Sequence, residues 1–389
     1  MVEKYLKSNL CVLPWTSLEV DVNGSASPCC LYKGEIGDFK VYKDDLHKIQ
    51  NSKYMNELRD QFRNGERPAG CTSCWQEEDA GKISKRMNSY YKMKNSLNGW
   101  TPESKPSLKF IDFKLGNICN LKCRICGSYS SSKWAQEELD YGANPVAKQN
   151  LDSGQWPKRN PAFFEDIKPV LKDVEYFEFT GGEPMMIENH FKILEHCIEN
   201  EYSKKQYLHY NTNGTKCPPL KVFWMWSQFK NVEIAFSIDD TEAAFEYQRH
   251  PASWQEVQDN LKEYKNFVGS NNIDFQICST INIFNILSLD RLLYWVKEFN
   301  PKYFHVNTLF APDCFNIQTL PKQLKKVVTE KYQHLPPYRS IINFMNMSDR
   351  HSHEMDAERK RRIRRTDEYR QEKFSEIFPA LNNFLRIYE

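Results

Sequence analysis

Six short apolar segments, separated by helical patterns, recur between residues 108 and 309. They are LKFIDF (108–113), VEYFEF (174–179), YLHYN (207–211), VEIAFSI (232–238), IDFQICSTI (273–281) and YFHVNTL (303–309). One intervening stretch, 253–268, opens with a capping box from Ser253 to Glu256 and places apolar residues on one face, namely Trp254, Val257, Leu261, Tyr264 and Val268. Alternating strands and helices are typical of parallel β/α units. Six units predict a partial (β/α)6 TIM-like barrel over residues 106–314.

The first hundred residues follow a different pattern. Residues 17–28 predict a hairpin around the favoured turn pair Asn23-Gly24, and residues 52–66 predict a helix. The segment 96–107 is rich in Pro, Gly and Ser and is the expected linker. We therefore expect a small cysteine-rich α+β domain at residues 1–100, ahead of the barrel.

Residues 315–389 are expected to form a helical C-terminal extension. Its basic run at 360–365 is surrounded by acidic residues, namely Glu354, Asp356, Glu358, Asp367 and Glu368. This mixture favours a solvated helix face over a nucleic-acid surface.

Charge and composition limit the partners and the compartment. The chain has 53 Lys and Arg against 51 Asp and Glu, a net charge of +2, which gives no reason to expect nucleic acid. No apolar run approaches the length of a membrane span, so we expect a cytoplasmic protein with no membrane partner. Because that compartment keeps thiols reduced, the twelve cysteines argue against a disulfide framework, and those in two groups have the spacing of metal ligands.

Polar motifs follow five of the six predicted strands. GNICNLKCRICGS (116–128) follows the first, and TGGEP (180–184) follows the second. NTNG (211–214), Ser237-Ile-Asp239 and Thr280-Ile-Asn282 lie at the ends of the next three. Since function in parallel β/α folds gathers at the carboxyl ends of strands, we expect these motifs to converge.

The first motif contains three thiols and no fourth. Cys119, Cys123 and Cys126 can hold three irons of a [4Fe-4S] cluster and leave the fourth iron for a ligand bearing an amine and a carboxylate. A zinc site would need a fourth ligand and would leave the other motifs unexplained. Ser237 and Asp239, two apart on a strand, point the same way and could bind a ribose diol.

These motifs resemble those of the radical S-adenosylmethionine (radical SAM) superfamily over residues 108–310. The resemblance implies a cluster on the three cysteines and reductive cleavage of S-adenosylmethionine to a 5′-deoxyadenosyl radical that abstracts a substrate hydrogen. It also implies an electron donor such as a flavodoxin or ferredoxin. By position, the cofactor-binding residues would be Ile125, Gly181, Gly182, Glu183, Asn213, Ser237, Asp239 and Asn282. Ile125 departs from the pattern, because this position is commonly aromatic.

A second cysteine group precedes the barrel. Cys11, Cys29, Cys71 and Cys74, with Cys30 as an alternative to Cys29, resemble the SPASM/twitch segments of some radical SAM enzymes, although those segments usually follow the barrel. The resemblance implies an auxiliary [4Fe-4S] cluster that takes up electrons. A small zinc ribbon on the same four thiols is the alternative.

Side-chain alternation predicts a polar barrel interior that suits a hydrogen-bonding substrate. The expected inward set is His209, Asn211, Glu233, Gln276, Cys278, His305 and Asn307. Cys278 is a candidate hydrogen donor to a substrate radical. A peptide or protein substrate is favoured slightly over a small polar metabolite or sugar that would be dehydrogenated or epimerised. A non-catalytic Fe-S or zinc protein that binds RNA or a partner is the remaining alternative.

Overall fold

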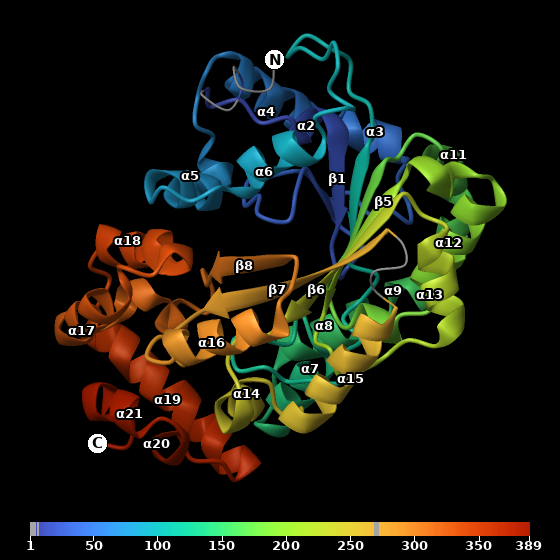
Figure 1. The fold of residues 1–389 in the computed structure, drawn as a ribbon. Helices are drawn as coiled ribbons and strands as arrows, with labels where there is room; N and C mark the ends of the chain where they lie inside the picture. Colours follow the sequence, from blue (N-terminus) through green and yellow to red (C-terminus); the bar gives the residue numbers. More distant parts are fainter. Residues whose placement is uncertain (1–4, 6–7, 268–271) are drawn as a thin grey trace.

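A sheet of eight strands forms the centre of the computed structural model, which describes residues 5, 8–267 and 272–389. The strands lie in the order β2, β1, β3, β4, β5, β6, β7, β8, and neighbours are parallel except β1 and β2 (Figure 1). Their bounds are β1 Ser17–Val20, β2 Ala26–Ser27, β3 Phe110–Phe113, β4 Tyr176–Phe179, β5 Tyr207–Thr212, β6 Asn231–Ser237, β7 Ile273–Ile281 and β8 Tyr303–Thr308. The six predicted strands are β3 to β8, so the predicted α/β class with a mainly parallel sheet is confirmed.

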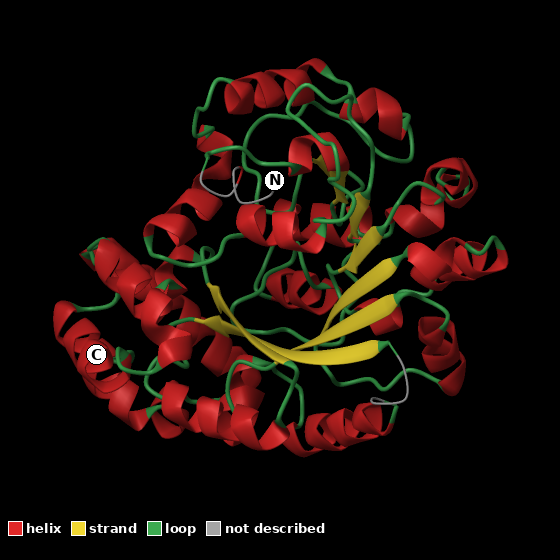
Figure 2. Ribbon diagram, turned by 45° about the horizontal axis from the view of Figure 1, so that its top comes forward, coloured by secondary structure: helices red, strands yellow, loops and turns green. Residues whose placement is uncertain are grey.

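Helices lie along the convex side of the curved sheet (Figure 2). The helices between β3 and β8 are α7 Ser132–Asp140, α8 Pro145–Ser153, α9 Trp156–Arg159, α10 Phe163–Asp166, α11 Lys168–Leu171, α12 Asn189–Glu199, α13 Leu220–Ser227, α14 Glu242–Gln248, α15 Trp254–Asn266 and α16 Leu289–Phe299. In α15 the hydroxyl of Ser253 accepts a hydrogen bond from the backbone N–H of Glu256, as the capping pattern predicts. Val257, Leu261 and other apolar side chains of α15 join the buried core against the strands, while Val268 lies outside the described residues.

The N-terminal region contributes two strands to the same sheet. The hairpin is present, with Gly24 at φ +75° in its turn, and β1 pairs in parallel with β3. The helices of this region are α2 Leu13–Thr16, α3 Leu46–Gln50, α4 Lys53–Arg63, α5 Thr72–Asp79 and α6 Lys85–Lys92. The sheet therefore crosses the boundary expected between residues 1–100 and 106–314.

One row of ionisable side chains runs across the sheet in register. It consists of Glu19, Asp112, Glu178, His209, Glu233 and Asp274. Lys85 of α6 places its Nζ 2.6 Å from a carboxylate oxygen of Glu178, so the row faces the N-terminal region. This face of the sheet is polar, as strand alternation predicts.

The C-terminal extension is helical and has a core of its own with the ends of β7 and β8. Its helices are α17 Lys322–Tyr332, α18 Arg339–Met347, α19 His353–Arg370, α20 Phe374–Ile377 and α21 Pro379–Leu385. The basic run lies in α19, where Arg361 and Arg362 pair with Glu358. Within the described ranges, no helix is long and apolar enough to cross a membrane.

Candidate active site

The three-cysteine loop follows β3 and is fixed by backbone hydrogen bonds to distant segments. The N–H of Lys122 donates to the carbonyl of His250, and that of Arg124 donates to the carbonyl of Gln248, both at 2.7 Å. The indole N–H of Trp134 donates to the carbonyl of Cys123 at 2.6 Å. The loop that carries Cys119, Cys123 and Cys126 therefore has a defined path.

The glycine-rich loop after β4 lies directly against the cysteine loop. A Cβ on Gly182 would fall 2.2 Å from the carbonyl oxygen of Ile118, and Gly181 has φ +101° with Lys114 close by. The backbone N–H of Glu183 donates to the same Ile118 carbonyl at 2.7 Å. The resemblance implies that these two glycines bind the cofactor; the structure adds that they permit a close approach of the cysteine loop.

Glu183 joins the ends of β4 and β5. Its carboxylate is buried and accepts hydrogen bonds from the backbone N–H of Asn213 and the hydroxyl of Thr212, both at 2.8 Å. Burial raises the pKa of this carboxyl above its ordinary value, against the lowering effect of those donors. The amide nitrogen of Asn213 lies 4.0 Å from the Cys119 sulfur, so the third motif also reaches the cysteine loop.

Asp239 is paired with Arg249, a residue that sequence reasoning missed. Arg249 Nη2 donates to Asp239 Oδ2 at 2.7 Å, and Arg249 Nη1 lies 3.9 Å from the Cys123 sulfur. Both side chains are buried, and the Nε of Arg249 has no hydrogen-bond partner among the described residues. Arg249 follows α14 and belongs to no recognisable sequence motif. Only its contacts with Asp239 and Cys123 in the folded structure identify it as a site residue.

The remaining predicted cofactor residues differ in their surroundings. Ser237 ends β6 and is half-buried. Asn282 is fully buried, and its amide bonds within its own loop, accepting from the N–H of Phe284 at 2.8 Å and donating to the carbonyl of Thr280 at 3.0 Å. Ile125 packs against the C-terminal core.

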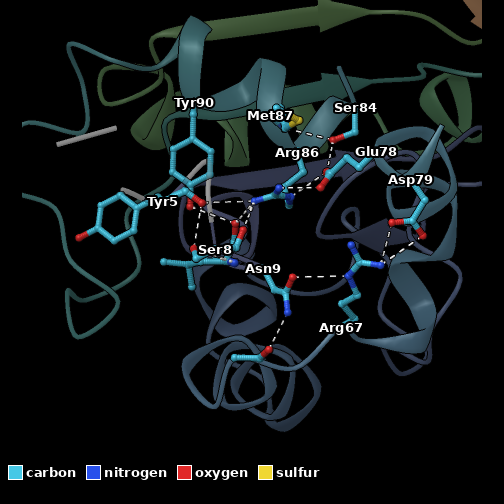
Figure 3. A network of polar contacts seen from close by, with 12 residues as sticks. Tyr5, Ser8, Asn9, Arg67, Glu78, Asp79, Ser84, Arg86, Met87 and Tyr90 are labelled. Carbon is cyan, nitrogen blue, oxygen red and sulfur yellow. Dashed lines mark hydrogen bonds and ion pairs between the residues drawn. The ribbon is translucent and has the colours of Figure 1, made fainter. Parts of the chain in front are cut away.

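The second cysteine group gathers around one small cavity. Cys11, Cys29, Cys71 and Cys74 line it together with Arg86. The guanidinium of Arg86 forms a bidentate pair with Glu78, at 2.8 and 2.7 Å, and donates to the carbonyls of Ser8 and Leu10 (Figure 3). Burial and the neighbouring Cys74 raise the pKa of Cys71 to about 12.

Cys30 has different neighbours from the quartet. It is absent from the cavity lining, and the charged groups that act on its thiol are Lys85, Asp112 and Glu178 on the inner face of the sheet. Of the two adjacent cysteines, Cys29 thus faces the other three thiols.

The inward polar set lies as strand alternation predicts. Ser237, Cys278 and His305 are in register across β6, β7 and β8. The amide of Asn307 lies 3.0 Å from the Cys278 sulfur, and His209 Nδ1 lies 3.2 Å from a Glu233 oxygen. Asn211 and Gln276 are half-buried on their strands. Burial raises the pKa of Cys278 to about 12, so its thiol carries a proton at neutral pH.

The donor sets suit iron-sulfur clusters. Thiolates are the ligands that such clusters take, and a buried guanidinium beside each cysteine group offsets thiolate charge. Across residues 5, 8–267 and 272–389, no three Cys, His, Asp or Glu side chains are arranged to hold a single metal ion.

Comparisons with known proteins bear on the cysteine quartet first. Residues 11–75 match the SPASM family, described as an iron-sulfur cluster-binding domain, and this range contains all four thiols. No curated protein matches the chain.

Solved structures give distant matches. Native anSMEcpe with bound AdoMet is 19% identical, with 52% of each chain covered and a TM-score of 0.39. Streptococcus suis SuiB bound to precursor peptide SuiA is 12% identical, with 76% of this chain and 63% of that chain covered and a TM-score of 0.35. TYW1 with a lysine-pyruvate adduct bound is 11% identical, with coverages of 58% and 71% and a TM-score of 0.32. The chain thus spans about half the length of anSMEcpe.

Residues 11–75 are thus similar to the iron-sulfur cluster-binding SPASM domain. The three-cysteine loop and the GGEP loop follow the adjacent parallel strands β3 and β4, so the two motifs that carry the radical SAM resemblance lie side by side in the structure.

Proposed function

We propose that the protein abstracts a hydrogen atom from a polar substrate, a peptide or protein, within a partial (β/α)6 barrel formed by residues 106–314. The observation that carries the proposal is the convergence of three strand-end motifs on one loop. Glu183 and Asn213 reach the backbone or thiols of the cysteine loop, and Asp239 reaches it through Arg249. Bound there, the [4Fe-4S] cluster and the S-adenosylmethionine that the radical SAM resemblance implies would supply a 5′-deoxyadenosyl radical.

The chain's own residues have distinct roles in this proposal. Cys119, Cys123 and Cys126 would hold the cluster. The two glycines, Glu183, Asn213, Ser237 and Asp239 would orient the cofactor, with Ile125 and Asn282 nearby. Asp239 keeps free acceptor capacity for a ribose hydroxyl, because Arg249 and the N–H of Thr280 occupy one site on each oxygen.

The N-terminal quartet would hold an auxiliary [4Fe-4S] cluster that accepts electrons, and a flavodoxin or ferredoxin would be the external donor. Four thiols around one cavity support a site that is closed by protein ligands. Cys30 is left free of this role.

The inner face of the sheet supports a polar substrate. Its half-buried Asn211, Gln276 and Asn307 offer hydrogen bonds rather than an apolar surface. Peptide amides fit such a surface. A small polar metabolite is the second candidate, because the same groups would bind hydroxyls.

Where the auxiliary cluster does not oxidise the substrate radical, Cys278 would return a hydrogen atom to it. In that step the S–H bond of Cys278 breaks and a substrate C–H bond forms, which leaves a thiyl radical on Cys278. One electron from the external donor and one proton would then restore the thiol. In deuterium oxide the wild type would place one deuterium in the product, and Cys278→Ala would not. Equal labelling by both proteins would contradict this role.

The decisive experiment is anaerobic reconstitution followed by dithionite and S-adenosylmethionine, with an assay for 5′-deoxyadenosine. The wild type and the matched control Cys197→Ala, a buried cysteine outside both groups, should form it. Protein with all three loop cysteines replaced by alanine should not. An intact cluster without 5′-deoxyadenosine would favour the non-catalytic alternative.

A further inference from the structure

We propose that the C-terminal extension positions the three-cysteine loop. Arg124, within that loop, is the positioning residue that contacts the extension. The inference rests on the proposed cluster at Cys119, Cys123 and Cys126. It assigns a role in cluster binding to residues 353–389, which no sequence motif suggests.

Arg124 lies inside the Cys-x3-Cys-x2-Cys run and is almost fully buried. Its Nη2 lies 2.6 Å from a carboxylate oxygen of Asp367 in α19 and also donates to Glu372, just beyond that helix. Its guanidinium carbon lies 3.7 Å from the centre of the Tyr247 ring. The side chain of a residue between two ligands is thus held by two carboxylates from a segment more than 240 residues away.

Glu372 holds the loop at a second point. Its other oxygen lies 2.7 Å from Nδ1 of His250, whose backbone carbonyl accepts from the N–H of Lys122. One carboxylate therefore contacts both the loop and the segment that pairs with the loop.

A further contact lies on the other side of the loop. Lys122 places its Nζ 2.5 Å from Glu137 of α7, and Arg370 of α19 lies 3.1 Å from the same carboxylate. Arg370 also lies over the ring of Trp134, which binds the carbonyl of Cys123. The extension reaches the loop through α7 as well as directly.

The carboxylate of Asp367 is held in place by residues other than Arg124. It accepts from the hydroxyl of Tyr247 at 2.8 Å and from the backbone N–H of Phe374 at 2.8 Å. A carboxylate held in this way offers a preformed site for a guanidinium, and removing one partner of such a buried pair leaves an uncompensated charge.

Docking of the C-terminal extension and binding of the cluster require the same conformation of the cysteine loop, so each should favour the other. Docking of residues 353–389 selects the path of the loop that presents the cysteines, so cluster binding should in turn stabilise the docked extension. Arg361 and Arg362 of α19 pair with Glu358 instead and take no part in these contacts.

The first test needs no substitution. Hydrogen exchange of the full chain is compared between metal-free and reconstituted protein, and amides of residues 365–374 should exchange at least fivefold more slowly after reconstitution. Equal exchange in the two forms would overturn the coupling. Residues 322–332 in α17 serve as the internal reference.

The second test uses conservative variants of the full chain. Asp367→Asn and Glu372→Gln, alone and combined, should release iron from the three-cysteine site to a chelator about tenfold faster. The iron of the quartet, measured in protein lacking the three loop cysteines, should be retained normally. Glu368→Gln, exposed on the same helix, is the matched control.

A purely structural role would give a different result. It would lower the retention of iron at both sites alike and leave the spectroscopic response to S-adenosylmethionine unchanged. The proposal predicts that Arg124→Lys keeps part of the retention and that Arg124→Gln alters the electron paramagnetic resonance signal of the reduced cluster. Wild-type iron retention and signal in Arg124→Gln would overturn it.

Discussion

Replacing Arg249 by methionine should destabilise the metal-free protein by about 3 to 5 kcal/mol. Arg249 and Asp239 form a buried ion pair, with side chains 9% and 1% exposed and a nitrogen–oxygen distance of 2.7 Å. Removing one partner of a buried pair leaves the other as an uncompensated charge, which costs about 3–5 kcal/mol. Asp239 would retain only one hydrogen bond to its carboxylate from the described residues, the N–H of Thr280 at 2.8 Å.

The double variant Arg249→Met/Asp239→Asn separates the cost of an uncompensated Asp239 charge from the cost of lost packing. Because asparagine carries no charge, the double variant should be more stable than Arg249→Met alone by about 1 kcal/mol or more. Arg361→Met is the matched control, since Arg361 pairs with Glu358 on an exposed helix face and its loss should cost under about 1 kcal/mol.

The assay is anaerobic urea unfolding of chelator-treated protein at pH 7.5, with a reductant present. Unchanged denaturant slopes would show that the midpoints report stability rather than a change in unfolded structure. A cost below about 1 kcal/mol for Arg249→Met, or a double variant less stable than the single one, would refute the buried pair.

Three other predictions concern single positions. Cys29→Ala should reduce iron from about eight to about four per chain after reconstitution while Cys30→Ala keeps about eight; equal loss in both, or one bound zinc per chain, would contradict the assignment of Cys29 to an iron-sulfur quartet. Gly182→Ala should cost about 2 kcal/mol, because its Cβ would meet the Ile118 carbonyl, whereas Gly127→Ala has room and should cost little; equal urea midpoints would count against the close loop contact. Burial lowers the pKa of His190 from its usual 6.5 to about 4, so its folded state binds fewer protons than the unfolded chain between those values. Stability from neutral His190 is complete above pH 6.5 and lost as pH falls towards 4, and wild type should lose about 2 to 3 kcal/mol more than His190→Phe between pH 7 and 4.5; parallel losses would refute this.

The six strands of the main sheet were predictable because each combines apolar residues with flanking helical periodicity. The role of β1 was not. Its four residues form a local hairpin with β2, and no local pattern indicates parallel pairing with β3, about 90 residues further on. Pairing between distant segments depends on the whole sheet rather than on the strand's own sequence.

In the candidate site, too, local motifs predict some residues, while contacts between distant segments reveal the others. Residues within short motifs, such as Cys119 and Glu183, could be found from spacing alone. Arg249, Arg86 and the partners of Arg124 could not, because each acts through a contact with a distant segment. The sequence predicts a cofactor role for the two glycines but not their contact with the cysteine loop, because the backbone that a Cβ would meet at Gly182 belongs to that other loop.

The two buried arginines, Arg86 and Arg249, differ in how fully their hydrogen-bond donors are paired, just as the two cysteine groups differ in their number of thiols. Arg86, beside four thiols, is saturated: Glu78 binds it at two points and backbone carbonyls take further donors. Arg249, beside three thiols, binds Asp239 with one nitrogen and keeps a buried Nε without a partner among the described residues. An unpaired buried donor is unfavourable unless a ligand completes it. These contacts support the proposal that the quartet is a closed site and that the three-cysteine loop is an open one, where an anionic group of a bound cofactor would satisfy the free Nε–H of Arg249.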